Sequence, residues 1–346
     1  MIYANLVYIF CYFAAYLLLN TYNMKKVSRS LLLFGLALCL FAPKSQAQIR
    51  RLNSAELFQS IKKLNVLGSV LYVAAHPDDE NTNLISYLAN DRNVNIRYLS
   101  LTRGDGGQNL LGSEQQDFLG AIRTQELLRA RGIDGGKQAF SRANDFGYSK
   151  NPEETLRFWD KQKVLSDVVW AIRKYQPDVV INRFDHTTAR PNHGHHTASA
   201  QLSNEAFDLA ANPNVFPEQL KYVSVWQPKR LLMNVSWWWY GGKDKFEKVD
   251  KSNMLKMDLG VYYPFKGKSN TEIAAESRSQ HRCQGMGTMP ERGAYAEYFE
   301  HLKGEKASAD VIDGINMTWS RVENGSLIDA IVREVIQAFD YNNPSA

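Results

Sequence analysis

Histidine and acidic residues gather in two short segments of this 346-residue chain. The first is His76-Pro77-Asp78-Asp79-Glu80, and the second, about 120 residues later, is His193-Gly194-His195-His196. Imidazole and carboxylate groups are the usual ligands of a catalytic zinc ion, which takes three from the protein and keeps one position open for water. A neighbouring carboxylate can then accept a proton from that water. Together the two segments predict a metal site for hydrolysis.

Each segment also has a plain structural explanation. Pro-Asp-Asp-Glu is a frequent start of a helix, where acidic side chains favour the positive end of the helix dipole. A histidine-rich loop can simply be polar surface. Both explanations lose force because the two segments occur in one chain, and because His76 stands directly before the acidic run. Pro77 restrains that turn, and adjacent Asp78 and Asp79 can point different ways, one toward a metal and one toward a substrate.

Short apolar runs that alternate with helical patterns must position these residues. Strand-like runs lie at 70–75, 94–101 and 178–182, and helical patterns at 81–89, 113–131, 164–175 and 195–211. Strands separated by helices of ten or more residues are typical of βαβ units and a parallel sheet. Both histidine segments follow a strand, and ligands of open α/β sheets bind beyond the carboxyl ends of the strands. The predicted fold is α/β and Rossmann-like, a mostly parallel sheet flanked by helices.

Beyond residue 223 the pattern becomes irregular and β-like, with further helices near 271–282 and 325–339. No repeat or low-complexity linker interrupts the chain, so 48–346 is predicted to be a single domain with C-terminal elaboration. The run Trp237-Trp238-Trp239-Tyr240 could stack on sugar rings or pack into the core, because alternate residues of a strand would send one or two indoles inward. His281 could approach the site or make an ordinary polar contact.

The N-terminal segment, 1–47, reads as an export signal. A basic stretch that begins at Met24 is followed by an apolar run at 31–42 and a small-x-small pattern at 45–47, which predicts a signal peptide cleaved before Gln48 and a periplasmic or secreted protein. Residues 1–23 either precede the true start or belong to a membrane hairpin, and we favour the first because their apolar run is short for a span. Membrane contact is expected only through this segment.

Charge and cysteine content exclude several classes of protein. The formal net charge is +5, but 1–47 contains four basic residues and no acidic one, which leaves 37 basic and 36 acidic residues in 48–346. A nucleic-acid partner is therefore not predicted. Cys283 is the one cysteine of 48–346, so an intramolecular disulfide and a zinc module built from two or four cysteines are both excluded there.

The two motifs, Ala75-His76-Pro77-Asp78-Asp79-Glu80 and His193-Gly194-His195-His196, resemble those of the PIG-L (LmbE-like) family of de-N-acetylases, zinc hydrolases of N-acetylglucosamine-type substrates. Segments 101–109, 123–127 and 279–285 resemble further parts of the family, so that the resemblance covers about 67–287. It implies one zinc ion per chain, or another divalent metal, with His76, Asp79 and His196 as the ligands.

The resemblance also implies roles for residues beside the metal. Asp78 would be the general base, which takes a proton from a zinc-bound water and later returns it to the leaving amine. His193 would hydrogen-bond the tetrahedral intermediate. Arg103 would grip substrate hydroxyls or phosphate, the alternative being a surface salt bridge.

One departure from the family pattern concerns the second motif. The family often has His-Pro-Asp-His, and the missing aspartate changes the surroundings of the third ligand. We expect His196 rather than His195 to be that ligand, because helical phase should let only one of two adjacent residues face inward.

These features predict an exported, zinc-dependent hydrolase that removes an N-acetyl group from an amino sugar or glycoconjugate. A metal-dependent amidase acting on a non-sugar amide would use the same residues. A carbohydrate-binding protein that has lost the reaction is a further alternative, which the complete set of ligands and base disfavours.

Overall fold

The first strand shows how the apolar runs of the sequence become core. The computed structural model describes residues 52–188 and 192–344, and the predicted export segment lies outside them. In β1 (Ser69–Ala74), Val70 and Tyr72 pack on one face of the sheet, and Leu71 and Val73 pack on the other. All four side chains are at most 1% exposed. A strand buried on both faces needs a continuous apolar sequence, which is why the pattern of this run does not alternate.

The sheet has seven strands in the order β3-β2-β1-β4-β5-β9-β6. Its first five strands are parallel neighbours, whereas β9 is antiparallel to both β5 and β6. The bounds of the other strands are β2 (Asn95–Ser100), β3 (Lys137–Phe140), β4 (Val179–Asn182), β5 (Arg230–Val235), β6 (Met254–Asp258) and β9 (Ala296–Gly304). The predicted α/β architecture with a mostly parallel sheet is therefore confirmed.

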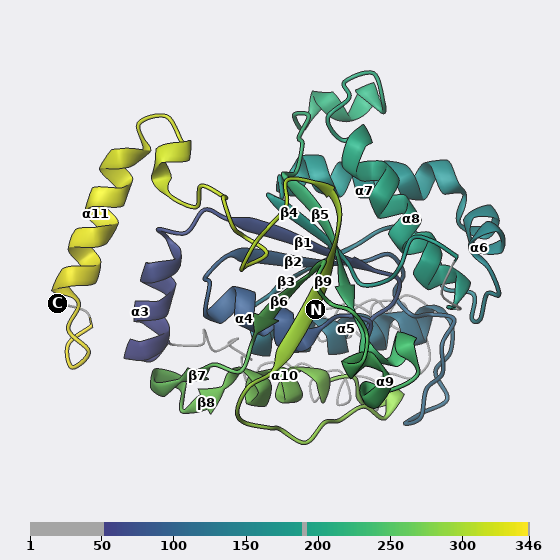
Figure 1. The fold of residues 1–346 in the computed structure, drawn as a ribbon, viewed down its shortest axis with the longest axis horizontal. Coiled ribbons are helices and arrows are strands. Elements are labelled where there is room, and N and C mark those ends of the chain that lie inside the picture. Colours follow the sequence, from purple (N-terminus) through teal and green to yellow (C-terminus); the bar gives the residue numbers. More distant parts are fainter. Residues whose placement is uncertain (1–51, 189–191, 345–346) are drawn as a thin grey trace, which may run out of the picture. The chain divides into compact units, whose positions relative to one another are not determined.

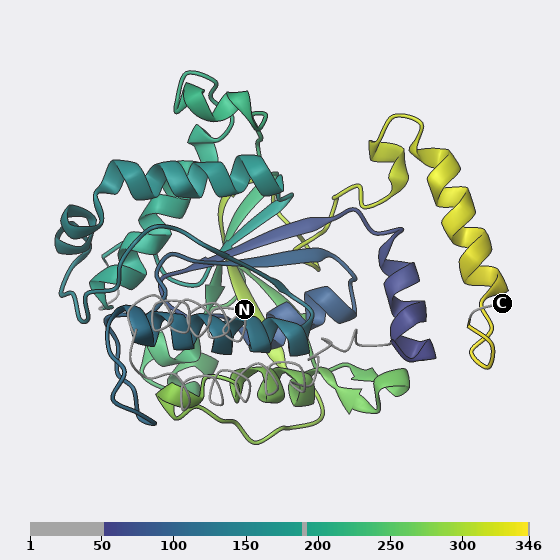
Figure 2. The same ribbon diagram turned by 180° about the vertical axis from the view of Figure 1, so that it is seen from behind.

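Helices cover both faces of the sheet (Figures 1 and 2). On one face α4 and α5 both pack against α10, and on the other α6 and α7 both pack against α8. The first layer consists of α4 (Thr82–Asn90), α5 (Asp117–Asp134) and α10 (Asn270–Arg278), and the second of α6 (Pro152–Trp159), α7 (Lys161–Tyr175) and α8 (Gly194–Leu209). The predicted helices are present, although α5 begins four residues later than its pattern.

Strand order reverses between β1 and β4. The chain leaves β1 toward β2 and β3 on one side, then returns to β4 on the other side. In doubly wound sheets such a reversal opens a crevice at the carboxyl ends of the two strands. The segment after β1 begins at Ala75-His76, and the segment after β4 leads to His193 at the start of α8, so both histidine motifs enter this crevice.

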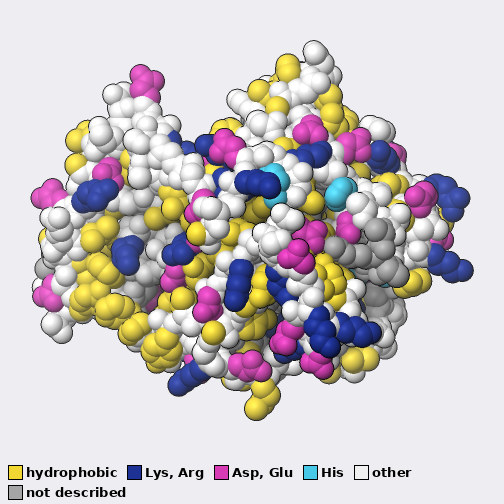
Figure 3. All heavy atoms as spheres, viewed as in Figure 1, with side chains coloured by type: hydrophobic (Ala, Val, Ile, Leu, Met, Phe, Trp, Pro, Cys, Tyr) yellow, Lys and Arg dark blue, Asp and Glu magenta, His cyan; other side chains and the backbone are white. Residues whose placement is uncertain are grey.

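Smaller elements surround this frame. They are α3 (Ser54–Lys63), η1 (Pro217–Lys221), η2 (Trp237–Tyr240), α9 (Lys243–Glu247), β7 (Tyr262–Tyr263), η3 (Pro264–Lys266), β8 (Lys268–Ser269), η4 (Arg282–Gln284), η5 (Trp319–Arg321) and α11 (Gly325–Ala338). Helices α3 and α11 pack against each other. Charged side chains of both signs are interspersed over the face in Figure 3. Among the described residues, no helix has the length and apolar character needed to cross a membrane.

Candidate active site

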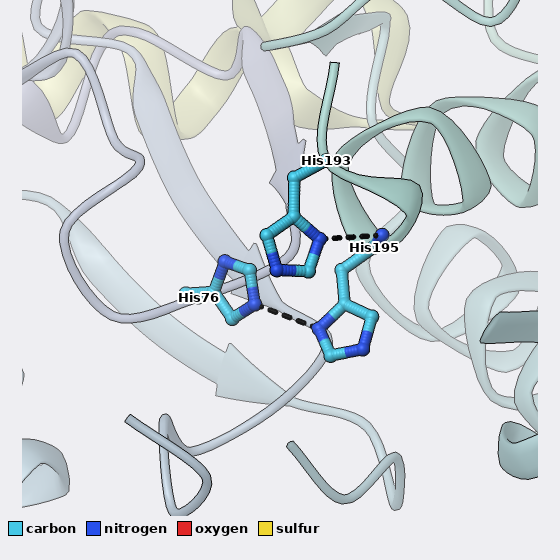
Figure 4. Close-up of side chains that lie close together, drawn as sticks. All are labelled: His76, His193 and His195. Carbon is cyan, nitrogen blue, oxygen red and sulfur yellow. Dashed lines mark hydrogen bonds between the residues drawn. The ribbon is translucent and has the colours of Figure 1, made fainter. Parts of the chain in front are cut away.

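Four histidines from the two motifs meet at the crevice. The ring of His76 lies 5.4, 5.1 and 5.3 Å, centre to centre, from the rings of His193, His195 and His196. Figure 4 shows His76 on the loop after β1, facing His193 and His195 at the N-terminal end of α8. Residues about 120 positions apart in the sequence therefore converge, as the two strand ends predict.

The predicted metal ligands form one compact group of donors. Candidate ligand atoms of His76, Asp79 and His196 all lie within 4.8 Å of one another. His76 Nδ1 is 3.1 Å from Asp79 Oδ2, and His196 Nε2 is 3.4 Å from Asp79 Oδ1. The other nitrogen of His196 is 2.8 Å from Asn192 Oδ1, which leaves Nε2 for a metal. The His196 ring also stacks on Phe184, 3.8 Å between centres.

A second group of donors meets the opposite nitrogen of His76. His76 Nε2 is 2.9 Å from His195 Nδ1, and His76, His193 and His195 also satisfy the spacing of a metal site. Asp145 stands beside both rings, 3.6 Å from His195 Nδ1 and 4.0 Å from His76 Nε2. His195 is fully buried, and its ring packs against Phe146 and Trp159.

The expectation that only one of His195 and His196 faces inward is wrong. Their side chains leave the first turn of α8 in different directions, and His76 lies between them, so that each ring reaches a different side of the site. His195 occupies the position where the family pattern has aspartate, and Asp145, from the loop after β3, supplies a carboxylate there instead. Asp145 carries no local sequence signal, because the loop that brings it is distant from both motifs.

Protonation differs among these groups. Burial opposes a charge on His76, but the Asp79 carboxylate outweighs it and raises the pKa of His76 to about 9. Burial lowers the pKa of His196 to about 3 and that of His195 to about 2, so both rings are neutral at neutral pH. Burial alone would raise the pKa of Asp79, yet the neighbouring histidines hold it well below its usual range. A neutral imidazole and an ionised carboxylate are the forms that bind metals.

Asp78 differs from Asp79 in both charge and backbone. Burial, followed by the negative charge of Asp79, raises the pKa of the Asp78 carboxyl. Its φ angle is 131°, a conformation that side-chain-bearing residues rarely adopt and that clusters at functional sites. The Asp78 N–H donates to Glu80 Oε2 at 2.9 Å, and Arg278 donates to the Asp78 carbonyl oxygen. Contacts on both sides of the peptide therefore hold this turn.

A buried charge network anchors the turn from behind. Glu80 Oε1 is 2.7 Å from His281 Nε2 and 3.3 Å from Arg131, which also pairs with Asp134 at 2.6 Å. Burial disfavours the Glu80 carboxylate, but His281 and Arg131 hold its pKa at about 2. Gln284 donates to the Pro77 carbonyl oxygen at 2.8 Å. The segment from α10 to η4 thus supports the first motif, and His281 makes a structural contact rather than facing the cavity.

A cavity of about 970 Å³ opens in front of the metal-ligand group. Its lining includes Asp78, Asp79 and His196, together with Arg183, which follows β4, and residues of η2 and β9. Arg183 donates to Asn234 Oδ1 at 3.2 Å. The predicted base and two predicted ligands therefore share one solvent-connected space that can admit a substrate.

The remaining two predicted site residues, His193 and Arg103, do not line this cavity. His193 caps α8, and its Nδ1 accepts a hydrogen bond from the His195 N–H at 3.0 Å. Arg103 donates to Thr124 Oγ1 at 3.1 Å and lies over the Phe140 ring. It lines a different cavity, with Asp117 and Arg142, so the structure does not bring it to the metal-ligand group.

The donor set fits a catalytic divalent metal. Two imidazoles and one carboxylate supply three ligands, and the cavity leaves one side of the group accessible. Catalytic zinc sites have this composition with an open position, and ferrous sites use the same ligand types. Asp79 is ionised and His196 is neutral, as metal binding requires, whereas His76 must lose a proton to bind.

Comparison with known proteins gives the following matches. Residues 71–207 match the model of the PIG-L family, GlcNAc-PI de-N-acetylase. N,N'-diacetylchitobiose deacetylase from Pyrococcus horikoshii is a similar solved structure, at 20% identity over 62% of this chain and 70% of that chain, with a TM-score of 0.47. GalB, the 4-carboxy-2-hydroxymuconate hydratase from Pseudomonas putida, is 15% identical over 70% of this chain and 100% of its own, with a TM-score of 0.46.

A deacetylase of teicoplanin biosynthesis is 12% identical over 68% of this chain and 100% of its own, with a TM-score of 0.39. No curated protein matches the chain in sequence. The similarity to this family therefore rests on the match over residues 71–207, which contains both histidine motifs. Over that part of the chain, the protein is similar to the PIG-L family, GlcNAc-PI de-N-acetylase.

Proposed function

We propose that this protein is an exported, divalent-metal-dependent hydrolase that removes the N-acetyl group of an amino sugar or glycoconjugate. The observation that carries the proposal is that Asp78 lines one cavity of about 970 Å³ with Asp79 and His196, two of the three donors of the His76, Asp79 and His196 group. The family match over residues 71–207 supports the reaction type.

The three donors would hold one metal ion per chain, with zinc as the expected ion. When bound, the ion acts as a Lewis acid that polarises the acetyl carbonyl. His76 must lose a proton before it can bind, because its pKa is raised to about 9 by Asp79. Asp79 and His196 are already in their binding forms.

Asp78 is the proposed general base. Hydrolysis adds a water oxygen to the acetyl carbon and breaks the C–N bond, so one proton must move from the water to the departing nitrogen. The raised pKa of Asp78 brings its proton affinity closer to neutral pH, where a general base is most effective. Asp78 accepts this proton and returns it to the amine.

His193 is the proposed hydrogen-bond donor to the reacting acetyl group. Burial, followed by the charge of His76, lowers the pKa of His193, which favours the neutral ring. Because Nδ1 accepts from the His195 N–H, the ring proton lies on Nε2. We propose that this N–H stabilises the negative oxygen that develops on the acetyl group.

Acetate release tests the reaction. The purified protein is incubated with N-acetylglucosamine, N,N'-diacetylchitobiose and a non-sugar acetamide, before and after chelation and zinc refilling. We expect metal-dependent release from the sugars and little from the acetamide. Release from the acetamide alone would replace the proposal with a metal-dependent amidase. Sugar binding without release from any substrate would leave a carbohydrate-binding protein.

Export is a separate part of the proposal and rests on the pattern of 1–47. N-terminal sequencing of the protein recovered from a bacterial periplasm or culture medium tests it. A mature chain that begins at Gln48 is expected, and an uncleaved chain confined to the cytoplasm contradicts export.

A further inference from the structure

The three consecutive tryptophans of η2 separate into two roles. Trp239 packs against the hydrophobic core. Trp237 and Trp238 stay 45% and 41% exposed, and both line the cavity that contains Asp78 and His196. A 3₁₀-helix has three residues per turn, so neighbouring side chains point about 120° apart. The segment is not the strand that the sequence suggested, and this geometry turns one indole inward and leaves two facing the cavity.

Contacts tie the exposed indoles to the proposed catalytic turn. The Arg183 guanidinium lies 6.0 Å from the centre of the Trp238 ring and donates to Asn234 Oδ1. The same oxygen accepts from Asn81 Nδ2 at 2.9 Å, and Asn81 follows the acidic run of the first motif and caps α4. Lys243 lies 5.7 Å from the Trp237 ring centre. The Arg183 contact thus links the indole platform, Trp237 and Trp238, through Trp238 to the frame that carries Asp79, and Lys243 of α9 borders Trp237.

The charge of the cavity favours an uncharged ligand. Its lining has six carboxyl side chains against four of lysine and arginine, a formal excess of two negative charges when all are ionised, which one divalent metal would offset. The lining therefore has no net positive charge to attract a phosphate-rich or polyanionic substrate. The volume of about 970 Å³ also lies at the upper end of the usual range for small-molecule sites, roughly 300–1,000 Å³.

We propose that Trp237 and Trp238 form a binding subsite for a second sugar ring, so that the substrate is a neutral oligosaccharide or glycan rather than a single amino sugar. Pyranose rings present apolar C–H faces that pack on an indole, while their hydroxyls need the polar groups that this cavity provides. This inference rests on the proposed de-N-acetylase function and names its substrate class.

The subsite is tested by measuring the affinity for N-acetylchitotetraose and for N-acetylglucosamine by calorimetry. The Asp78→Asn protein is used so that the sugars are bound without turnover. We expect the tetramer to bind at least about tenfold more tightly than the monomer. Adding Trp238→Ala should weaken tetramer binding about 3–10-fold, the size of an aromatic contact, and Trp238→Phe should restore most of it. Tyr222→Ala, an exposed aromatic residue outside the cavity, should leave it unchanged.

The outcomes separate the subsite from the reaction. The subsite is overturned if Trp237→Ala and Trp238→Ala, each added to the Asp78→Asn protein, leave its affinity for the tetramer unchanged. The melting temperatures of these proteins must also be unchanged. If these substitutions weaken tetramer binding but the Asp78-containing protein releases no acetate from any substrate, the subsite stands and the de-N-acetylase function fails. Absence of binding to either sugar, with acetate released from a non-sugar amide, overturns the glycan class.

Discussion

The two sides of His76 have similar donors and different surroundings. Its Nδ1 faces Asp79, next to His196, in a group that opens into the large cavity. Its Nε2 faces His195 and, at longer range, Asp145. Phe146 and Trp159 close over His195, which is fully buried. Donor spacing alone would accept either side as a metal site, but it is the first that shares the cavity of about 970 Å³ with Asp78.

The two carboxylates, Asp79 and Asp145, have different proposed roles. Asp79 is a proposed ligand, whereas Asp145 lies 3.6 Å from His195, the ring that contacts His76 Nε2, and so supports His76 through His195. Metal-binding histidines usually direct their second nitrogen to a polar partner, and loss of such support typically costs 10–100-fold in metal affinity or activity. The lesson is that access to a cavity, and not the number of nearby donors, distinguishes a catalytic site from its support.

The largest effect is expected for Asp79→Ala, on the open side. Loss of the carboxylate removes one of three ligands, so zinc per chain, measured by elemental analysis, should fall from about one to near zero. Affinity should drop by more than the roughly 100-fold upper bound for a supporting residue, and acetate release should disappear. Asp208→Asn, a surface carboxylate paired with Lys303, serves as the control and should retain metal. Full zinc occupancy in Asp79→Ala would contradict the ligand assignment.

Asp78→Asn should separate chemistry from metal binding. The amide cannot accept a proton, so kcat should fall about 10²–10⁴-fold, the usual contribution of a general base. Zinc content and KM should change little, because Asp78 is not a proposed ligand. The measurement is steady-state acetate release beside elemental analysis of the same sample. A variant with near-normal kcat would show that another group moves the proton.

Asp145→Asn, on the closed side, should have the smallest of the three effects. We expect zinc affinity to fall about 10–100-fold, measured by competition with a chelator, while the zinc-saturated variant keeps most of its activity. Asp79→Asn is the matched comparison, since it makes the same chemical change on the other side of His76. If Asp145→Asn lost zinc as completely as Asp79→Ala, the closed group would be the better candidate for the metal site.

Much of the fold could be predicted because its signals are local. The apolar run of β1 and the helical pattern of α7 identify these elements without any partner. The sequence did not reveal β3 or α6, since a four-residue strand and an eight-residue helix are too short to show a period. The prediction of a strand at residues 237–240 was also wrong, because these residues form a 3₁₀ helix. Aromatic residues are compatible with both conformations.

The sequence by itself determined the residues that can do the chemistry. His76, Asp78 and Asp79 lie on one short turn, so their proximity follows from the covalent chain. The position of both motifs directly after predicted parallel strands implied that His196 would join them. Only the tertiary structure decided that Asp145 lies beside His195 on the far side of His76, and that Trp237 and Trp238 face the cavity. These placements depend on how distant loops pack, and no local period or spacing encodes that packing.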